Sequence, residues 1–201
     1  MLKRLQGHLN ASLPLRTLEL AADEQKPLSG APLLTGKPLL LILNVGEDEV
    51  RDRRLADDVA RHFAAQLVHV MQVSAKIEEE LAVLEDPAER AAFLTELGIT
   101  ESAIDALTRV SYAALGLISY FTVGPDEVRA WTVRRGAAAP EAGRVIHSDI
   151  ERGFIRAELI KYDDLLALGS EQAVASAGKA QLKGKEYLVQ DGDILNFRFS
   201  V

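Results

Sequence analysis

The chain has 201 residues, 48% hydrophobic and 26% charged, which is ordinary for a globular protein of one large or two small domains. It has no cysteine, which excludes disulfides, thiolate metal sites and a cysteine nucleophile and fits a cytoplasmic protein. The net charge of −7 argues against a protein that coats nucleic acid by charge alone, and no apolar run approaches the roughly 18 residues of a membrane span.

Residues 1–36 are predicted to form short helical fragments. Prolines and a glycine interrupt any longer helix in this segment, namely Pro14, Pro27, Gly30 and Pro32. The apolar periodicity is also poor, so the segment is expected to be the end of a larger element.

A strand, a helix and a second strand follow. Residues 38–43, PLLLIL, predict a strand that is buried on both faces. Leu55, Val59 and Phe63 recur every four residues and predict an amphipathic helix. Residues 67–73, LVHVMQV, predict the second strand. This pattern is typical of a βαβ unit with a parallel sheet, which needs further strands to be buried, so we expect part of an α/β domain.

Residues 76–116 are predicted to be helical. Asp86 and Pro87 have the pattern of an N-cap followed by a first-turn proline. Gly98 is expected to end that helix, and Thr100 to cap the next one. The many acidic residues of this segment have the ordinary pattern of a solvated helix face.

From residue 119 onwards the pattern changes to short strands and helices, so a domain boundary is expected near residue 118. The expected strands are SYFTVG and EVRAWTVRRG around a turn at Gly124-Pro125, then GFIRAELIKY; the expected short helices are PEAGRVIHSDI and EQAVASAG. The final stretch, YLVQDGDILNFRFSV, predicts a hairpin with Asp191-Gly192 in its turn. Together these elements predict a compact α+β domain.

Polar residues follow both strands of the predicted parallel sheet. Asn44, Val45 and Glu47 come after the first strand, and Ser74 and Ala75 after the second. Ligands of open α/β sheets bind at such strand ends. An amide offers a donor and an acceptor, and a carboxylate accepts from an amino group, which suits the edge of a purine base. The alternative is a polar strand-end turn followed by a helix N-cap.

No phosphate-binding loop accompanies this candidate base site. The nearest candidate, GAPLLTGKP, has five residues between Gly30 and Gly36 where a P-loop has four, and Pro38 stands where a Ser or Thr is required. No Asp has a Gly three residues later, so a magnesium-side D-x-x-G motif is absent as well. The four histidines, His8, His62, His69 and His147, show no ligand spacing. No catalytic residue and no metal ligand is therefore assigned.

Basic residues accompany aromatic residues in the last part of the chain. Six of them are candidates for an RNA- or ribosome-facing surface: Arg129, Arg134, Arg135, Arg156, Lys183 and Lys185. Alternation along strands would place the aromatic rings in the core and the basic groups on an outer sheet face that can meet phosphates. The alternative is an ordinary surface of mixed charge.

These residues carry a resemblance to a known family. The stretch from YFTVGPDEVRAW to IERGFIRAELIKYDDL, followed by GKEYLVQDGDILNFRFSV, resembles the C-terminal TGS domain of the YchF/Obg-like ATPases, which are P-loop NTPases of the translation-factor class. KPLLLILNVGED and VSAKIEEELAVL resemble two nucleotide motifs of that family in the right order. The resemblance implies an α/β plus α+β fold with three parts. These are residues 1–36, the end of a helical arm; 37–118, a partial P-loop NTPase βαβ segment with a helical neck; and 119–201, a β-grasp, ubiquitin-like TGS domain.

The resemblance also implies a function. The family carries N-x-x-E where most GTPases carry N-K-x-D; Asn44 and Glu47 fit this variant, and Val45 replaces the lysine. It implies binding and hydrolysis of ATP or GTP with Mg²⁺ in the intact protein, and association with ribosomes or RNA, with neither a membrane nor DNA as partner. Because the phosphate and magnesium motifs are missing, this chain alone is expected to be inactive and to hold no nucleotide tightly. The alternative is a non-catalytic TGS module that binds RNA or the ribosome.

Overall fold

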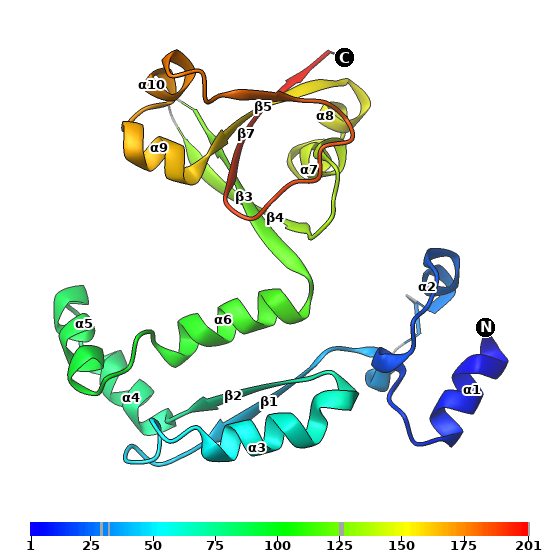
Figure 1. Cartoon of the computed structure of the whole chain (residues 1–201), viewed down its shortest axis with the longest axis vertical. Helices are drawn as coiled ribbons and strands as arrows, with labels where there is room; N and C mark the ends of the chain where they lie inside the picture. Colours follow the sequence, from blue (N-terminus) through cyan, green and yellow to red (C-terminus); the bar gives the residue numbers. More distant parts are fainter. Residues whose placement is uncertain (29, 32, 125–126, 201) are drawn as a thin grey trace. The chain divides into compact units, whose positions relative to one another are not determined.

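The computed structural model describes residues 1–28, 30–31, 33–124 and 127–200. The chain divides into two compact units, Met1–Ala114 and Leu115–Val201, called unit 1 and unit 2 (Figure 1). The boundary expected near residue 118 falls inside a strand, because the first strand of unit 2 begins at Leu117. None of the helices in the described ranges combines the length and the apolar character needed to cross a membrane.

Unit 1 begins with short helical pieces, as the prolines predict. They are α1 (Leu2–Asn10), η1 (Leu15–Thr17), α2 (Ala22–Leu28) and η2 (Leu34–Gly36). The guanidinium of Arg4 donates to the carboxylate of Glu24 at 2.8 Å, which ties α1 to α2. These contacts are local, so the segment is held together by turns and side-chain bonds rather than by one continuous helix.

The predicted βαβ unit is confirmed. Strands β1 (Leu39–Asn44) and β2 (Val68–Val73) are parallel, and α3 (Arg54–Phe63) with η3 (Ala64–Gln66) connects them. The register runs from Leu39 opposite Val68 to Asn44 opposite Val73. Both strands therefore end at the same edge of the sheet, where β2 leads into α4 (Figure 1).

The expectation that β1 is buried on both faces is wrong. Leu39 and Ile42 are each 45% exposed. In the described part of the chain this sheet has two strands, so β1 has a neighbour on one side only. An apolar run predicts a strand, but its burial depends on the elements that surround it.

Three helices complete unit 1: α4 (Ala75–Val83), α5 (Pro87–Glu96) and α6 (Ala103–Ala114). The predicted start of α5 is confirmed, since the Asp86 carboxylate accepts from the backbone N of Ala88 at 2.9 Å. Gly98 follows this helix with a φ of +65°, which favours glycine. The capping role expected of Thr100 belongs instead to Ser102, whose hydroxyl accepts from the backbone N of Asp105 at 3.1 Å.

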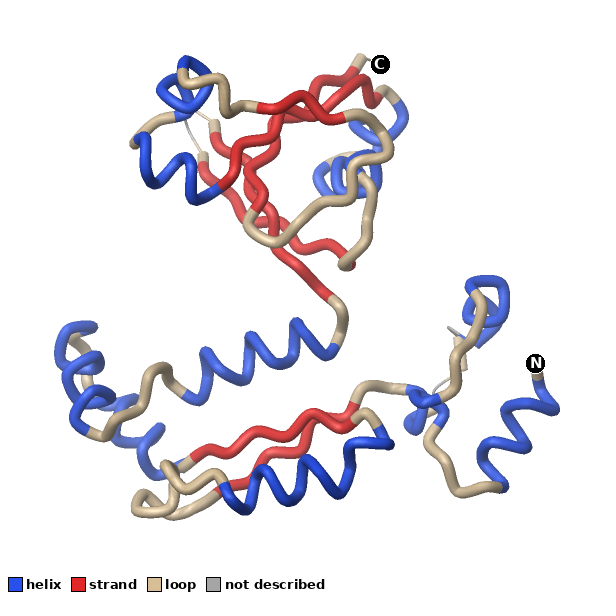
Figure 2. The backbone as a smooth tube through the Cα atoms, in the orientation of Figure 1, coloured by secondary structure: helices blue, strands red, loops and turns tan. Residues whose placement is uncertain are grey.

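Unit 2 is built on a five-stranded mixed sheet with the order β4-β3-β7-β5-β6 (Figure 2). Its strands are β3 (Leu117–Val123), β4 (Val128–Arg134), β5 (Phe154–Lys161), β6 (Gln181–Lys183) and β7 (Asp193–Phe199). Its helices are α7 (Ala139–Ile146), α8 (Ser148–Arg152), α9 (Tyr162–Leu168) and α10 (Glu171–Ser176). Strand β7 is parallel to β3 and antiparallel to β5, so it forms the centre of the sheet.

Both faces of this sheet carry a core. On one face, Tyr120 and Leu195 pack with Ala142 of α7, and the Tyr120 hydroxyl donates to the carbonyl of Ala142 at 2.7 Å. Burial of this phenol raises its pKa above the usual range. On the other face, Ile160 packs with Val174 of α10. Helices therefore cover parts of both faces of the sheet.

The predicted C-terminal hairpin is wrong, although its turn is present. Gly192 has a φ of +81°, and the Asp191 carboxylate accepts from the backbone N of Ser119 at 2.8 Å. The residues before the turn form only an isolated bridge between Leu188 and Ala138, because β3 and β5 already occupy both sides of β7. The short helix expected over residues 140–150 is two helices, α7 and α8, and β6 and α9 were not predicted. Of the turn expected at Gly124-Pro125, Pro125 lies outside the described residues.

A polar network is buried where β7 begins. The Asp193 carboxylate, fully buried, accepts from Lys161 Nζ at 2.6 Å, from the Tyr187 hydroxyl at 2.7 Å and from the backbone N of Gln190 at 2.8 Å. Burial alone would lower the pKa of Lys161, but the bond to Asp193 raises it. Burial, together with Asp193, raises the pKa of Tyr187. The network ties β5 and the segment before β7 to one carboxylate.

The start of β3 gives a test of where the independently folding part begins. Ile118, 2% exposed, belongs to the core of unit 2. We expect residues 115–201 to unfold cooperatively on their own, and residues 119–201, which lack Ile118, to melt about 10 °C lower or more. Thermal unfolding of both fragments by circular dichroism checks this. Equal melting temperatures would mean that the core does not need the first residues of β3.

Candidate functional site

The structure brings the candidate residues Asn44, Val45 and Ala75 together at the edge where β1 and β2 end. The side-chain oxygen of Asn44 accepts from the backbone N of Ala75 at 3.0 Å. The backbone N of Val45 donates to the carbonyl of Val73 at 2.9 Å. Asn44 thus satisfies a helix N-terminal donor from the neighbouring strand, as an N-cap side chain does within its own helix. We call this edge, from Asn44 to Glu47 together with Ala75, the rim.

The side-chain nitrogen of Asn44 remains available as a hydrogen-bond donor. The amide oxygen is taken by Ala75, whereas the nitrogen donates to no group in the described part of the chain. Because a backbone N–H can only donate, the bond to Ala75 assigns the oxygen to that side of the amide. Asn44 is therefore set up as a hydrogen-bond donor, which suits an acceptor such as a purine ring nitrogen.

Glu47 lies in a tight turn just beyond Asn44, in which the backbone N of Glu49 donates to the carbonyl of Gly46 at 3.2 Å. The Glu47 carboxylate pairs with Lys76 of α4, a contact that the sequence did not predict. The hydrogen bond to Glu47 raises the pKa of Lys76. Both side chains are more than a third exposed, so solvent screens this ion pair and it contributes little to stability. The carboxylate can therefore exchange lysine for another donor at little cost.

Ser74 is placed differently from the other candidates. It is 3% exposed, its hydroxyl caps nothing in α4, and that hydroxyl has no partner in the described part of the chain. It lines a cavity of about 420 Å³ whose lining includes Gln72 and Glu78 but neither Asn44 nor Glu47. The Ser74 hydroxyl is therefore separated from the side chains of the rim, although its backbone carbonyl begins α4 by accepting from Glu78.

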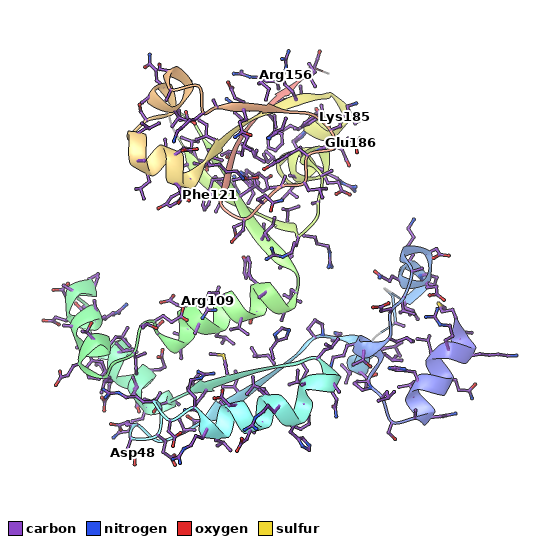
Figure 3. The ribbon with its side chains drawn as sticks, viewed as in Figure 1. Asp48, Arg109, Phe121, Arg156, Lys185 and Glu186 are labelled. Carbon is purple, nitrogen blue, oxygen red and sulfur yellow. The ribbon has the colours of Figure 1, made fainter. Side chains whose placement is uncertain are left out.

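The loop after the rim is anchored by two side chains that the sequence analysis missed. The Gln72 amide nitrogen, on β2, donates to three backbone carbonyls of this loop. The Arg51 guanidinium donates to the carbonyls of Leu97 and Glu96 at the end of α5. Figure 3 labels Asp48, which belongs to this loop. A polar residue near the end of a mostly apolar strand was the only signal for Gln72.

The basic candidates of unit 2 do not share one sheet face. Arg129 lies two residues before Trp131 on the same face of β4, with its guanidinium over the ring, 4.3 Å from the centroid. The expectation that alternation would separate basic from aromatic side chains is therefore wrong for this pair. Lys183 lies over the Tyr187 ring at 5.0 Å. Arg156 stands opposite Arg198 on β5 and β7, on the face away from Leu195 and Tyr120. In the described part of the chain, five of the six basic candidates make no ion pair or hydrogen bond, namely Arg134, Arg135, Arg156, Lys183 and Lys185, whereas Arg129 pairs with Glu127. Figure 3 labels Arg156 and Lys185.

No group of three or more His, Asp or Glu side chains in the described residues could hold a metal ion. The rim therefore offers a hydrogen-bond donor from Asn44 and an exchangeable carboxylate from Glu47, both partly open to solvent. This arrangement can bind the edge of a small planar molecule with alternating acceptor and donor groups.

Comparisons with known proteins agree on one family. The family model YchF-GTPase_C, described as a protein of unknown function (DUF933), matches residues 117–200. The ribosome-binding ATPase YchF of Bacillus subtilis (strain 168) is 48% identical over 204 residues, covering 100% of this chain and 56% of that protein. Obg-like ATPase 1 of Oryza sativa subsp. japonica is 38% identical, covering 99% of this chain and 51% of that protein. The chain thus spans about half the length of the curated relatives it matches.

Solved structures point the same way. The structure of the Schizosaccharomyces pombe YchF GTPase superposes with a TM-score of 0.82 at 31% identity, covering 98% of this chain and 53% of that one. A GTP-binding protein from Pyrococcus horikoshii OT3 gives a TM-score of 0.56 at 19% identity, covering 83% of this chain and 47% of that one, which is a likeness of fold alone. The mixed α/β fold is therefore similar to that of a solved YchF protein.

The two halves of the Asn44 amide can be separated by mutation. Asn44→Ala leaves the backbone N of Ala75 without its partner, so we expect a loss of about 1 kcal/mol of local stability and faster hydrogen exchange at that amide. Asn44→Asp keeps the acceptor and should keep Ala75 protected, while removing the free donor. Hydrogen exchange followed by NMR checks both variants. Equal deprotection of Ala75 in the two variants would show that the side-chain oxygen does not hold it.

Proposed function

Because the chain belongs to the YchF family and matches the C-terminal part of its curated members, we propose that it is the base-recognition and C-terminal half of a ribosome-binding, Obg-like ATPase. The observation that carries this proposal is the rim, where the Asn44 amide keeps a free donor directly beside the start of α4. The fixed position of that donor favours a nucleotide base over a polar turn with no ligand, because the turn itself needs only the oxygen of the amide.

The fold supports the assignment of each part of the chain to one part of such an ATPase. Residues from 37 to the end of unit 1 are the C-terminal part of a P-loop NTPase domain with a helical neck, and residues 1–36 the end of its helical arm. The five-stranded mixed sheet with helices in unit 2 supports a β-grasp TGS domain that begins before Leu117, where its first strand starts, rather than at residue 119. The whole protein works in the cytoplasm, at the ribosome.

At the rim, Asn44 and Glu47 form hydrogen bonds with different groups of the base. The Asn44 nitrogen donates to a purine ring nitrogen, which adenine and guanine share. Discrimination therefore falls to Glu47, which accepts from the amino group of adenine, and to Val45, which lacks the lysine stem that covers the base in most GTPases. The intact protein would bind ATP or GTP together with Mg²⁺ and hydrolyse the nucleotide. The residues here fit the base but not the phosphates or the metal ion, so this chain alone hydrolyses neither nucleotide.

Titration with AMP and GMP tests this function on the chain as it stands. Base contacts alone are expected to give affinities no tighter than about millimolar, or about −4 kcal/mol, so chemical-shift changes of ¹⁵N-labelled protein are the appropriate measurement. We expect AMP to shift the amides of Val45, Glu47 and Ala75, and GMP to shift them less. Glu47→Asp with Val45→Lys should move the preference toward GMP about tenfold, since one charged hydrogen bond contributes about 1.5–3 kcal/mol.

Asp48→Glu is the matched control, because Asp48 is an exposed carboxylate in the same loop and lies outside the N-x-x-E motif. This change should leave both titrations as they are. A wild-type chain that responds equally to AMP and GMP, or a double variant with an unchanged preference, would contradict base recognition at the rim.

A second candidate function is a binding module for RNA or the ribosome, carried by unit 2. The observation that favours it is the set of basic side chains that make no ion pair or hydrogen bond in the described ranges, which includes Arg156 and Lys185. Replacing both by alanine should weaken binding to ribosomes. The slope of log affinity against log salt concentration should also become shallower, by about one for each phosphate that is no longer neutralised. Lys179→Ala is the control, since Lys179 already pairs with Asp164 at 2.5 Å. Equal effects of the control and the double change would argue against a specific basic surface.

A further inference from the structure

Gln72 makes an unusual set of contacts for a side chain within a strand. It lies on β2, half-buried, between Met71 and Val73. Its amide nitrogen lies 3.0 Å from the carbonyl oxygen of Glu49, 3.2 Å from that of Val50 and 3.0 Å from that of Asp52. Three acceptors thus converge on one NH₂ group, so only a hydrogen-bond donor fits at this point.

The three carbonyls belong to the second of two consecutive turns that follow β1. In the first turn, the backbone N of Glu49 donates to the carbonyl of Gly46; in the second, the backbone N of Asp52 donates to the carbonyl of Glu49 at 2.9 Å. Glu49 therefore ends one turn and starts the next. Glu47 is the second residue of the first turn. By holding the carbonyl of Glu49, Gln72 fixes the end of the turn that presents Glu47.

The other contacts of the first turn are weaker. The ion pair of Glu47 with Lys76 is exposed, and the backbone N of Gly46 reaches the Glu49 carboxylate only at 3.3 Å. Arg51 ties the second turn to the end of α5, not to the sheet. Gln72 is thus the side chain that connects the loop with the strand on which Ser74 and Ala75 follow.

The other half of the Gln72 amide supports the same interpretation. Its oxygen is buried in the cavity shared with Ser74 and has no partner in the described part of the chain. A buried acceptor without a partner is unfavourable, so an apolar side chain of the same length would serve packing better. What the amide contributes is its donor, and that donor is used entirely on the loop.

We propose that Gln72 is a positioning residue for base recognition. Its amide holds the paired turns of residues 46–52 against β2, which keeps the backbone of Glu47 in place relative to Asn44 and so sets the preference for adenine over guanine. This inference rests on the proposed function of the rim. It adds a residue that touches no nucleotide and lies outside the N-x-x-E motif.

Gln72→Met tests it, because methionine keeps the length of the side chain and removes the donor. In the full chain we expect the amides of Glu49 and Asp52 to exchange about fivefold faster or more. We also expect the ratio of AMP to GMP affinity, measured by chemical-shift titration, to fall about threefold or more toward one. Gln72→Glu, which has the same shape but places a carboxylate against three carbonyls, should do the same.

Val70→Ala is the matched control. Val70 lies two residues earlier on the same face of β2, and its replacement removes packing but no polar interaction. It should lower the melting temperature while leaving the AMP to GMP ratio unchanged, which separates positioning from general stability.

The possible failures are distinguishable. If the wild-type chain does not discriminate AMP from GMP, the proposed function fails, and this inference with it. If the wild type discriminates and Gln72→Met discriminates equally well, the rim stands and the role of Gln72 is overturned. Unchanged exchange of the Glu49 and Asp52 amides in Gln72→Met would overturn it as well, whatever the nucleotides show.

Discussion

The parallel register of β1 and β2 at their carboxyl ends is the constraint on which unit 1 depends. Parallel strands need a crossover, here α3, and their carboxyl ends then meet at one edge. The pairing places Asn44 opposite Val73, and the Asn44 side chain carries the pairing one step further by accepting from Ala75. A slip of one residue would turn Asn44 to the other face of the sheet and separate it from α4. The position of the free donor of Asn44 is therefore a consequence of strand register rather than of the loop that follows.

The groups around the rim differ in how firmly they are held. Asn44 is fixed by a hydrogen bond from the backbone N of Ala75. The following loop is fixed in two ways: Gln72 donates to backbone carbonyls of the loop, and Arg51, within the loop, donates to backbone carbonyls at the end of α5. The carboxylate of Glu47 has only an exposed lysine as its partner in the described residues. A binding site needs such a combination, because rigid donors give orientation and an exchangeable group lets the ligand replace a weak contact rather than a strong one.

The sequence predicted those features that local pattern decides. Apolar runs located β1 and β2, and the residues that follow the two strands, which include Asn44 and Ala75, were correctly expected near one edge. Features decided by distant partners were missed or wrong. Asp191-Gly192 specifies a reversal of the chain but not the strand that pairs with β7, so a hairpin was expected where β3 and β5 are the partners. Strand β6 has three residues, too few for a pattern. Gln72 looked like one polar residue in a strand, since its three acceptors lie about 20 residues earlier in the chain.

Unused hydrogen-bonding capacity distinguishes the rim from the buried network of unit 2. Asp193 accepts from Lys161, Tyr187 and a backbone N, so its carboxylate has its partners within the protein and serves the fold. Its burial would also be costly without these partners, which explains why they surround it completely. At the rim, by contrast, the nitrogen of Asn44 has no partner in the described part of the chain although its oxygen is bound. A side chain that is held in place by one half and left open on the other is preorganised for a ligand, because the entropy of fixing it has already been lost on folding.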